Sequence, residues 1–257
     1  GWIDISILAV YFIAIIWWAL RHGKSNDSTS YFLAGRNMRW PAIGLALFAA
    51  SISSSTLIGQ SGDAYSTGIA VFNYNLISVI VMIFFAVFFL PFYIKSGVFT
   101  MPEFLERRFD SRSRYYFSFI TILGNIFLDA AGALYAAALI IKLIIPELGL
   151  QTIIIIFAFA VASYTIPGGL SSAISAEIIQ AVILIAGSII LTYLSLTNGG
   201  AEYLQTLIAD HAMTMQLIRP LDDPSVPWLG LIVGIPILGF YFWGNNQTLV
   251  QRVLSAR

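Results

Sequence analysis

Seven long apolar stretches dominate this chain and decide the medium in which it can fold. A helix needs about 20 mostly apolar residues to cross the hydrocarbon core of a bilayer. Such stretches occupy residues 2–20, 40–60, 70–94, 115–141, 150–166, 172–196 and 228–250 of the 257-residue chain. Only 10% of the residues are charged, whereas soluble domains carry about 25%. The sequence therefore predicts an all-α, polytopic membrane protein in which residues 1–257 form a single transmembrane domain.

The basic residues indicate how the spans are oriented, because Lys and Arg collect on the cytoplasmic side of a membrane. If the N-terminus lies outside, Lys142 and Arg219 are the only two of the 13 basic residues that fall outside. We therefore expect an integral protein of the plasma (inner) membrane with its N-terminus outside. The chain starts at Gly1 rather than Met and stops directly after an apolar stretch, so we also expect it to be incomplete at its C-terminus.

Composition argues against several classes of function. Thirteen basic residues balance thirteen acidic ones, so no charge excess points to nucleic acid. The chain has no cysteine and only His22 and His211, which argues against a thiolate or histidine metal centre. A membrane enzyme would also lack a base for a serine nucleophile, so we expect no enzyme activity. A seven-helix retinal protein is disfavoured because the last stretch has no Lys for a Schiff base.

Two connecting segments have helical patterns of their own. Residues 96–114 predict either a short amphipathic helix lying on the membrane or a plain charged connector. In the segment 197–227 the apolar residues have the spacing of an amphipathic surface helix before three prolines. These apolar residues are Leu204, Leu207, Ile208, Met215 and Leu217.

Two of the apolar stretches are interrupted by polar residues. Residues 51–56 read Ser-Ile-Ser-Ser-Ser-Thr and are followed by Gly59 and Gly62, while residues 239–248 read Gly-Phe-Tyr-Phe-Trp-Gly-Asn-Asn-Gln-Thr. Paired broken helices at corresponding positions of two halves are the best sequence indication of a transporter with inverted repeats. The alternative is that these small residues only allow helices to pack closely.

Three acidic residues, Asp63, Asp129 and Glu177, lie in or at the edge of the apolar stretches. No Lys or Arg is expected to be buried with them, so cations or protons are their expected partners. For Asp129 a protonated carboxyl group bonded across helices is an equal alternative. For Asp63 we favour a helix cap near the outer mouth.

Four ordered motifs across nearly the whole chain resemble the sodium:solute symporter family. They are the run Ser30 to Arg36 with Trp40 and the polar stretch Ala49 to Gly62, then Pro102 to Phe109, then Gly168 to Gln180, and finally Trp243 to Arg252. The resemblance implies a LeuT-like fold of five plus five helices in inverted repeats. This chain would then hold one extra helix, the first repeat and the first helix of the second repeat.

The resemblance also implies binding residues for sodium and solute. The sodium ligands would be the carbonyl groups of Ala49 and Ile52, with hydroxyl partners beyond Arg257. Glu177 stands where relatives that use a second sodium ion have Asp. The solute site would include Ser53, Thr56, Gln60, Tyr74, Asn75, Ser78, Gly239 and Phe242. Of the four polar residues with which sugar-transporting relatives bind their solute, this chain retains only the one at Ser78. Ser53 and Thr56 match the hydroxyls with which a sialic-acid-type relative holds a carboxylate.

We therefore expect a sodium-coupled symporter that imports a small polar solute by alternating access. A sugar-like solute is the first expectation, and sialic acid or another organic anion is the second. The expected partners are the solute, the sodium ion and the lipid bilayer, with no nucleic acid, and the oligomeric state stays open. The alternative is an inactive transporter fragment or a membrane scaffold, because one repeat alone cannot form a two-sided site.

Overall fold

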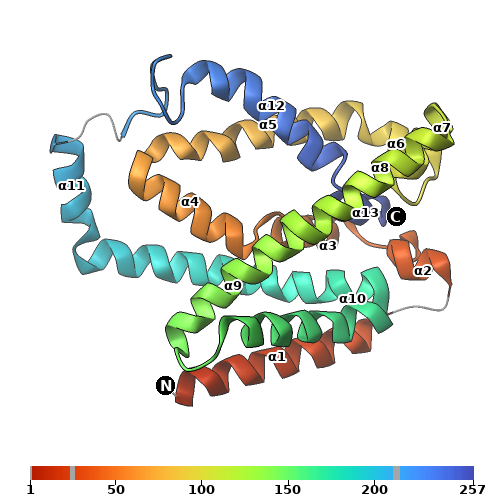
Figure 1. Ribbon diagram of the computed structural model, residues 1–257, viewed down its shortest axis with the longest axis horizontal. Helices are drawn as coiled ribbons and strands as arrows, with labels where there is room; N and C mark the ends of the chain where they lie inside the picture. Colours follow the sequence, from red (N-terminus) through yellow and green to blue (C-terminus); the bar gives the residue numbers. More distant parts are fainter. Residues whose placement is uncertain (1, 24–26, 211–214) are drawn as a thin grey trace. The chain divides into compact units, whose positions relative to one another are not determined.

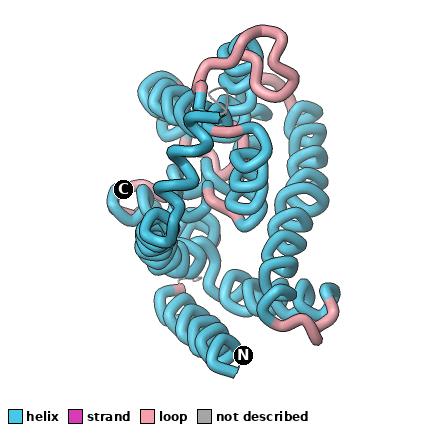
Figure 2. The backbone as a smooth tube through the Cα atoms, turned by 90° about the vertical axis from the view of Figure 1, so that its left-hand side faces the viewer, coloured by secondary structure: helices cyan, strands magenta, loops and turns pink. Residues whose placement is uncertain are grey.

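A computed structural model describes residues 2–23, 27–210 and 215–257 of the chain, and within these ranges every regular element is helical (Figures 1 and 2). The residues group into two compact units that are described separately below. Unit 1 comprises residues 1–56, 97–182 and 247–257, and unit 2 comprises residues 57–96 and 183–246. The helices α4 and α10 contribute residues to both units.

Unit 1 is built from helical elements of different lengths. They are α1 (Trp2–His22), α2 (Ser28–Leu33), the 3-10 turn η1 (Ala34–Arg36), α3 (Trp40–Ser51), α7 (Met101–Arg108), α8 (Ser111–Gly124), the π-helical stretch η3 (Asn125–Ala130), α9 (Ala131–Ile144), the first part of α10 (Leu150–Ser195) and α13 (Gln247–Leu254). Side-chain caps start three of them. Asp27, Thr100 and Asp110 each accept a hydrogen bond from the backbone N–H three residues later. These polar residues satisfy N–H groups that a helix start leaves without partners.

The helix α10 contains a sharp reversal that the Gly168–Gly169 pair makes possible. Gly169 has φ 59° and ψ −156°, a combination essentially confined to glycine, and the ribbon turns back on itself there (Figure 1). A Cβ atom at Gly169 would lie 2.6 Å from the carbonyl oxygen of Tyr31. The segment after α1 thus packs directly against this turn, and the Tyr31 hydroxyl donates a hydrogen bond to the carbonyl of Ile166 at 2.8 Å.

The same segment also contacts α13 at its far end. The side-chain amide of Gln251 donates to the carbonyl of Phe32 at 2.6 Å. The backbone N–H of Met38 donates to the Ser255 carbonyl at 3.1 Å, and that of Arg257 returns a bond to the Met38 carbonyl at 3.1 Å. Residues 31–38 therefore form a strap that joins the turn of α10 to α13 within unit 1.

Unit 2 is built around the pair α5 (Asn73–Phe88) and α12 (Trp228–Gly244), which pack against each other along their lengths. It also includes the α4 (Ser54–Thr67) residues from Leu57 onward, the turn η2 (Ile69–Phe72), α6 (Leu90–Ser96), the π-helical stretch η4 (Leu196–Gly200) and α11 (Ala201–Asp210). Close approach of α5 and α12 depends on two glycines. Cβ atoms at Gly239 and Gly244 would lie 3.3 Å from Val81 and 3.0 Å from Phe85, respectively.

The apolar stretches predicted from the sequence coincide with helices in the structure. Among the described residues, four helices are long and apolar enough to cross a membrane, and two bent pairs qualify if each pair counts as one span. The bent pairs are α3 with α4 and α12 with α13, which are the two stretches predicted to be broken. The count of seven spans stays a prediction.

Two local expectations can be compared with the structure. Residues 101–108 form the helix α7, so the helical alternative for that connector is confirmed. In the segment 197–227, α11 ends at Asp210, residues 211–214 with His211 lie outside the described part, and Met215 and Leu217 are not in an α-helix. Leu204, Leu207 and Ile208 thus share the helix α11, whereas the expectation that this helix includes Met215 and Leu217 is wrong.

Candidate functional site

The first interrupted span breaks at Ile52 and Ser53, between the end of α3 and the start of α4. Ile52 has extended backbone angles, and its N–H donates to the Ala49 carbonyl at 3.4 Å. In a continuous helix the Thr56 N–H would bond to the Ile52 carbonyl. Here the Thr56 N–H donates to the Ser53 hydroxyl instead, at 3.2 Å. The break thus turns the Ile52 carbonyl away from its regular helical partner.

The hydroxyl groups at this break bond mainly to one another. The Ser53 hydroxyl lies 2.8 Å from that of Ser55 and 3.0 Å from that of Thr56. The Ser54 hydroxyl donates to the Ala133 carbonyl of α9 at 2.7 Å. The structure therefore brings together the hydroxyls of Ser53 and Thr56, two of the expected solute residues, at the break that follows the expected sodium ligands Ala49 and Ile52. Neutral carbonyl and hydroxyl oxygens of this kind suit a sodium ion.

Glu177 has a basic partner, which corrects the expectation that no Lys or Arg is buried with the acidic residues. The Nε atom of Arg252 donates to Oε2 of Glu177 at 2.8 Å, and its Nη2 atom donates to Oε1. The two side chains are only 9% and 13% exposed. Arg252 was overlooked as a partner because it follows the apolar stretch by two residues, although it belongs to the last motif, Trp243 to Arg252. A guanidinium group therefore supplies the positive charge that a cation was expected to supply.

The other two acidic residues are not part of a cluster. Asp63 lies inside α4, where it is exposed, so the prediction that it caps a helix is wrong. Asp129 is exposed in the π-helical stretch η3. No group of three or more His, Asp or Glu side chains suited to a metal ion occurs within residues 2–23, 27–210 and 215–257.

Unit 2 carries the remaining predicted solute residues. The side-chain amides of Gln60 in α4 and Asn75 in α5 face each other, with two reciprocal contacts of 3.4 Å. At this length the contacts are weak, so both amides retain hydrogen-bonding capacity for a ligand. Tyr74 lies next to this pair in α5, partly exposed.

Ser78 and Phe242 meet at a residue that was not among the predicted ones. The indole Nε1 of Trp243 donates to the Ser78 hydroxyl at 2.9 Å and to the Ser78 carbonyl at 3.1 Å. The rings of Phe242 and Trp243 meet edge to face with centroids 5.1 Å apart. Trp243 opens the last motif, which was the available signal. Gly239 is buried, and a Cβ atom there would lie 3.3 Å from the Val81 side chain, so this glycine serves close helix packing.

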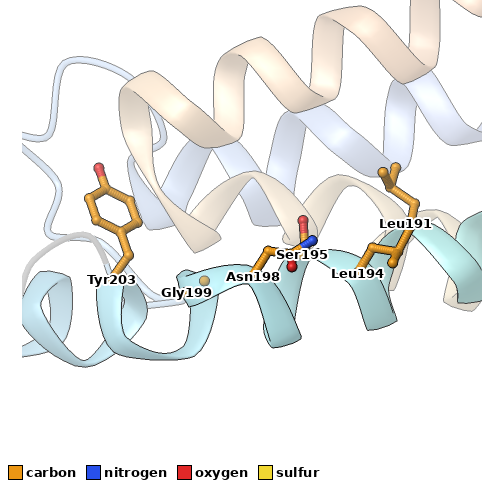
Figure 3. A pocket seen from close by; sticks show the side chains of 7 residues that line it. Leu191, Leu194, Ser195, Asn198, Gly199 and Tyr203 are labelled. Atoms are coloured by element: carbon orange, nitrogen blue, oxygen red, sulfur yellow. The ribbon is translucent and has the colours of Figure 1, made fainter.

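A surface cavity of about 480 Å³ lies elsewhere in unit 2, along the end of α10 and the start of α11 (Figure 3). It is lined by Leu191, Leu194, Ser195, Asn198, Gly199, Gly200 and Tyr203. No predicted sodium or solute residue is among these seven, so this cavity is separate from the candidate site.

Comparisons with known proteins agree with the motifs. A model of the sodium:solute symporter family matches residues 31–257. A sodium/glucose cotransporter of Vibrio parahaemolyticus is 31% identical over 271 residues, which cover 100% of this chain and 50% of that protein. Sodium/glucose cotransporter 1 of Mus musculus is 32% identical over 281 residues, and a mouse sodium/myo-inositol cotransporter is 33% identical over 287 residues. Each covers 99% of this chain, which spans 42% and 39% of those proteins, respectively.

A solved structure shows the same fold. A Na⁺-coupled sialic acid symporter in a substrate-bound, outward-open state superposes with a TM-score of 0.89 at 22% identity. The match covers 100% of this chain and 54% of that one. The all-α, LeuT-like fold expected from the sequence is thereby confirmed. The chain spans about half the length of the relatives that it matches.

Proposed function

Because this chain belongs to the sodium:solute symporter family, we propose that it contributes the first half of a sodium-coupled importer of a small polar solute. The protein is an integral membrane protein of a transporter family, and in this proposal it moves its substrate without making or breaking a covalent bond. The observation that carries the proposal is the break at Ile52 and Ser53, where hydroxyl groups gather in an apolar span and the Thr56 N–H bonds to Ser53 instead of to the Ile52 carbonyl.

We propose that the carbonyls of Ala49 and Ile52 bind the sodium ion. The Ser53 hydroxyl supports this site by occupying the Thr56 N–H, which would otherwise bond to the Ile52 carbonyl and rewind the helix. Sodium binding would in turn stabilise the broken arrangement, because an ion shifts a conformational equilibrium toward the state that it binds better. Glu177 is left out of this sodium site because its two oxygens already bond to Arg252.

We propose a neutral, hydroxyl-rich solute such as a sugar as the first candidate substrate. The facing amides of Gln60 and Asn75 offer both donors and acceptors, which is what a polyol requires. The Vibrio and mouse relatives are named for glucose and myo-inositol. Tyr74, Ser78 and Phe242 complete the proposed set in unit 2, whereas Gly239 is left out because it is buried against Val81.

An organic anion such as sialic acid is the second candidate. Ser53 and Thr56 lie at the start of the 14-residue helix α4, and helix N-termini favour negative charge. The solved structure that shares this fold is a sialic acid symporter. A carboxylate would bond to the two hydroxyls, whereas a sugar would use mainly the amides of Gln60 and Asn75.

We also propose that the N-terminus lies outside the membrane. With the N-terminus outside, the strap at residues 31–38 and the helix α7 lie on the cytoplasmic side, where their Arg residues are expected. Accessibility of single cysteines introduced at Glu147 and Arg112, exposed positions between the predicted spans, to a membrane-impermeant thiol reagent tests this orientation. Labelling of Glu147→Cys from outside and protection of Arg112→Cys in sealed cells are expected.

The experiment that tests the function measures binding of hexoses, inositol, sialic acid and amino acids at varied sodium concentrations. It uses this 257-residue chain and the longest product of its gene. The variant Ser53→Ala frees the Thr56 N–H and is expected to raise the sodium concentration for half-maximal binding about tenfold, the equivalent of one lost interaction of about 1.4 kcal/mol.

The matched control is Ser61→Ala, because the Ser61 hydroxyl donates only to the Leu57 carbonyl of its own helix at 2.6 Å. This variant is expected to keep the sodium dependence of the unmodified protein. Solute binding that does not depend on the sodium concentration, in both the 257-residue chain and the longest gene product, would refute the coupling mechanism. Equal sodium dependence of the Ser53 and Ser61 variants would refute the role given to the break.

A further inference from the structure

A buried ion pair holds together the segment that precedes α12. Arg219 and Asp223 are only 8% and 5% exposed at their side chains, and the Nη1 atom of Arg219 donates to Oδ2 of Asp223 at 3.2 Å. Buried charges are costly unless they are paired and hydrogen-bonded. This pair is therefore held by further contacts on both sides.

Asp223 organises the approach to α12. Its Oδ1 atom accepts from the Ser225 N–H at 2.9 Å, the Ser225 hydroxyl at 2.8 Å and the Val226 N–H at 2.8 Å. These bonds hold the pKa of the carboxyl group at about 2, below its ordinary value of 3.8, because they favour the ionised form. Val226 is thereby fixed just before Pro227, the N-cap residue of α12.

Arg219 reaches in the opposite direction, to the end of α4. Its Nη2 atom donates to the carbonyl of Thr67, the last residue of α4. Its backbone carbonyl accepts from the N–H of Trp228, the first residue of α12, at 3.2 Å. One residue thus bonds directly to the last residue of α4 and the first residue of α12.

The start of α5 joins the same assembly. Asn73, its first residue, is buried and donates from Nδ2 to the carbonyls of Ala70 at 2.9 Å and Leu217 at 2.5 Å. Below these bonds, Ala70 and Val226 pack with Leu231 and Ile235 of α12 in one apolar cluster. The segment 217–228 therefore contacts α4, α5 and α12 at one end of each helix.

These three helices carry the solute residues proposed in unit 2, namely Gln60 on α4, Asn75 and Ser78 on α5, and Phe242 on α12. We propose that residues 217–228 act as a clasp that makes these helix ends move as one body, and that Arg219 and Asp223 are positioning residues for solute binding. This inference rests on the proposed function for its effect on transport. The clasp itself is a property of unit 2 and is measured independently.

The first measurement follows the clasp directly in the full protein. The 257 residues contain no cysteine, so spin labels can be attached to a single engineered pair, with any cysteine outside these residues replaced by serine. Tyr65 on α4 and Ile232 on α12 are 88% and 60% exposed and suit labelling. The unmodified clasp is expected to give one narrow distance distribution, and Asp223→Asn is expected to broaden it.

A matched control and a milder variant keep the test decisive. Asp222→Asn makes the same chemical change one residue away, at an exposed side chain, and is expected to leave the distribution narrow. Arg219→Lys keeps the charge but loses the planar fork that reaches Thr67 and Asp223 together. It is also expected to broaden the distribution, and it decides the question if Asp223→Asn does not fold.

The second measurement separates positioning from a merely structural role. At saturating sodium, Arg219→Lys and Asp223→Asn are expected to raise the KM for the solute about tenfold and to change the turnover less, because the solute surfaces lose their alignment. A purely structural role would lower the amount of folded protein and leave the KM of the remainder unchanged, which would overturn the positioning role. Narrow distributions in both variants would overturn the clasp. Solute binding without sodium would refute the coupling mechanism but leave the distance result valid.

Discussion

Removing one member of the Glu177 and Arg252 pair should cost far more stability than removing both. The two side chains are about nine-tenths buried, so either single variant leaves an unpaired charge inside the protein. Breaking a buried pair in this way typically costs about 3 to 5 kcal/mol, whereas replacing both members by apolar residues is often neutral. We therefore expect Glu177→Met and Arg252→Met each to be strongly destabilised, and the double variant to recover most of the loss.

The assay is a double-mutant cycle on the thermal unfolding midpoint in detergent. About 1 kcal/mol shifts the midpoint of a chain of this size by about 2 to 4 °C, so each single variant should fall by about 6 to 20 °C. The interaction energy is the amount by which the double variant departs from the sum of the two single variants. A double variant whose loss equals that sum would refute the reasoning, since independent losses mean that the pair is not coupled.

Sodium dependence of the same variants distinguishes an ion pair from an ion-binding residue. If Glu177 serves only to neutralise Arg252, the double variant keeps the sodium concentration for half-maximal solute binding. A large rise in that concentration, in a double variant as stable as the unmodified protein, would instead show that Glu177 binds sodium. Arg252→Met alone is not informative here because it combines both effects.

Two further predictions follow from local geometry. The variant Gly169→Ala should lower the free energy of unfolding by about 2 to 4 kcal/mol, because the backbone angles disfavour any Cβ atom and the added atom would lie 2.6 Å from the Tyr31 carbonyl oxygen. The matched control is Gly187→Ala, where a Cβ atom would meet no other atom within 4 Å. Equal thermal unfolding midpoints of the two variants would contradict the role of the turn. The stability that Asp223 contributes should be complete above pH 3.8 and lost as the pH falls from 3.8 toward 2, because its folded-state pKa is depressed to about 2. The difference in unfolding midpoint between the unmodified protein and Asp223→Asn, measured across this range, should shrink toward zero, and a constant difference would exclude the carboxylate as its source.

The sequence predicted the helical fold and its breaks because these depend on local composition. The polar run at Ser51 to Thr56 lies between apolar residues, and it marks the break at Ile52 and Ser53 directly. The turn in α10 at Gly169 likewise falls between the two predicted stretches 150–166 and 172–196. Signals of this kind are readable from a single chain because cause and effect lie within a few residues of each other.

Contacts between distant residues were not predicted. Glu177 and Arg252 are 75 residues apart, and Ser78 and Trp243 are 165 residues apart. Neither pairing follows from periodicity or hydropathy, since each depends on how α10 and α13, or α5 and α12, pack. The motif from Trp243 to Arg252 contained both missing partners, but a motif does not say which side chain its members face.

The π-helical stretch from Asn125 to Ala130 sets the angular phase of α9. An α-helix turns about 100° per residue. A π-helical stretch that accommodates one extra residue therefore rotates the residues after it by about that angle, relative to a regular α-helix of the same length. The carbonyl of Ala133, which receives the Ser54 hydroxyl, lies three residues beyond this stretch. Rewinding this stretch as a regular α-helix with all six of its residues kept would turn this acceptor about 100° away from Ser54, whereas removing one residue together with the rewinding would restore the original phase. Residues remote from the broken span thus decide which backbone oxygen is presented to it.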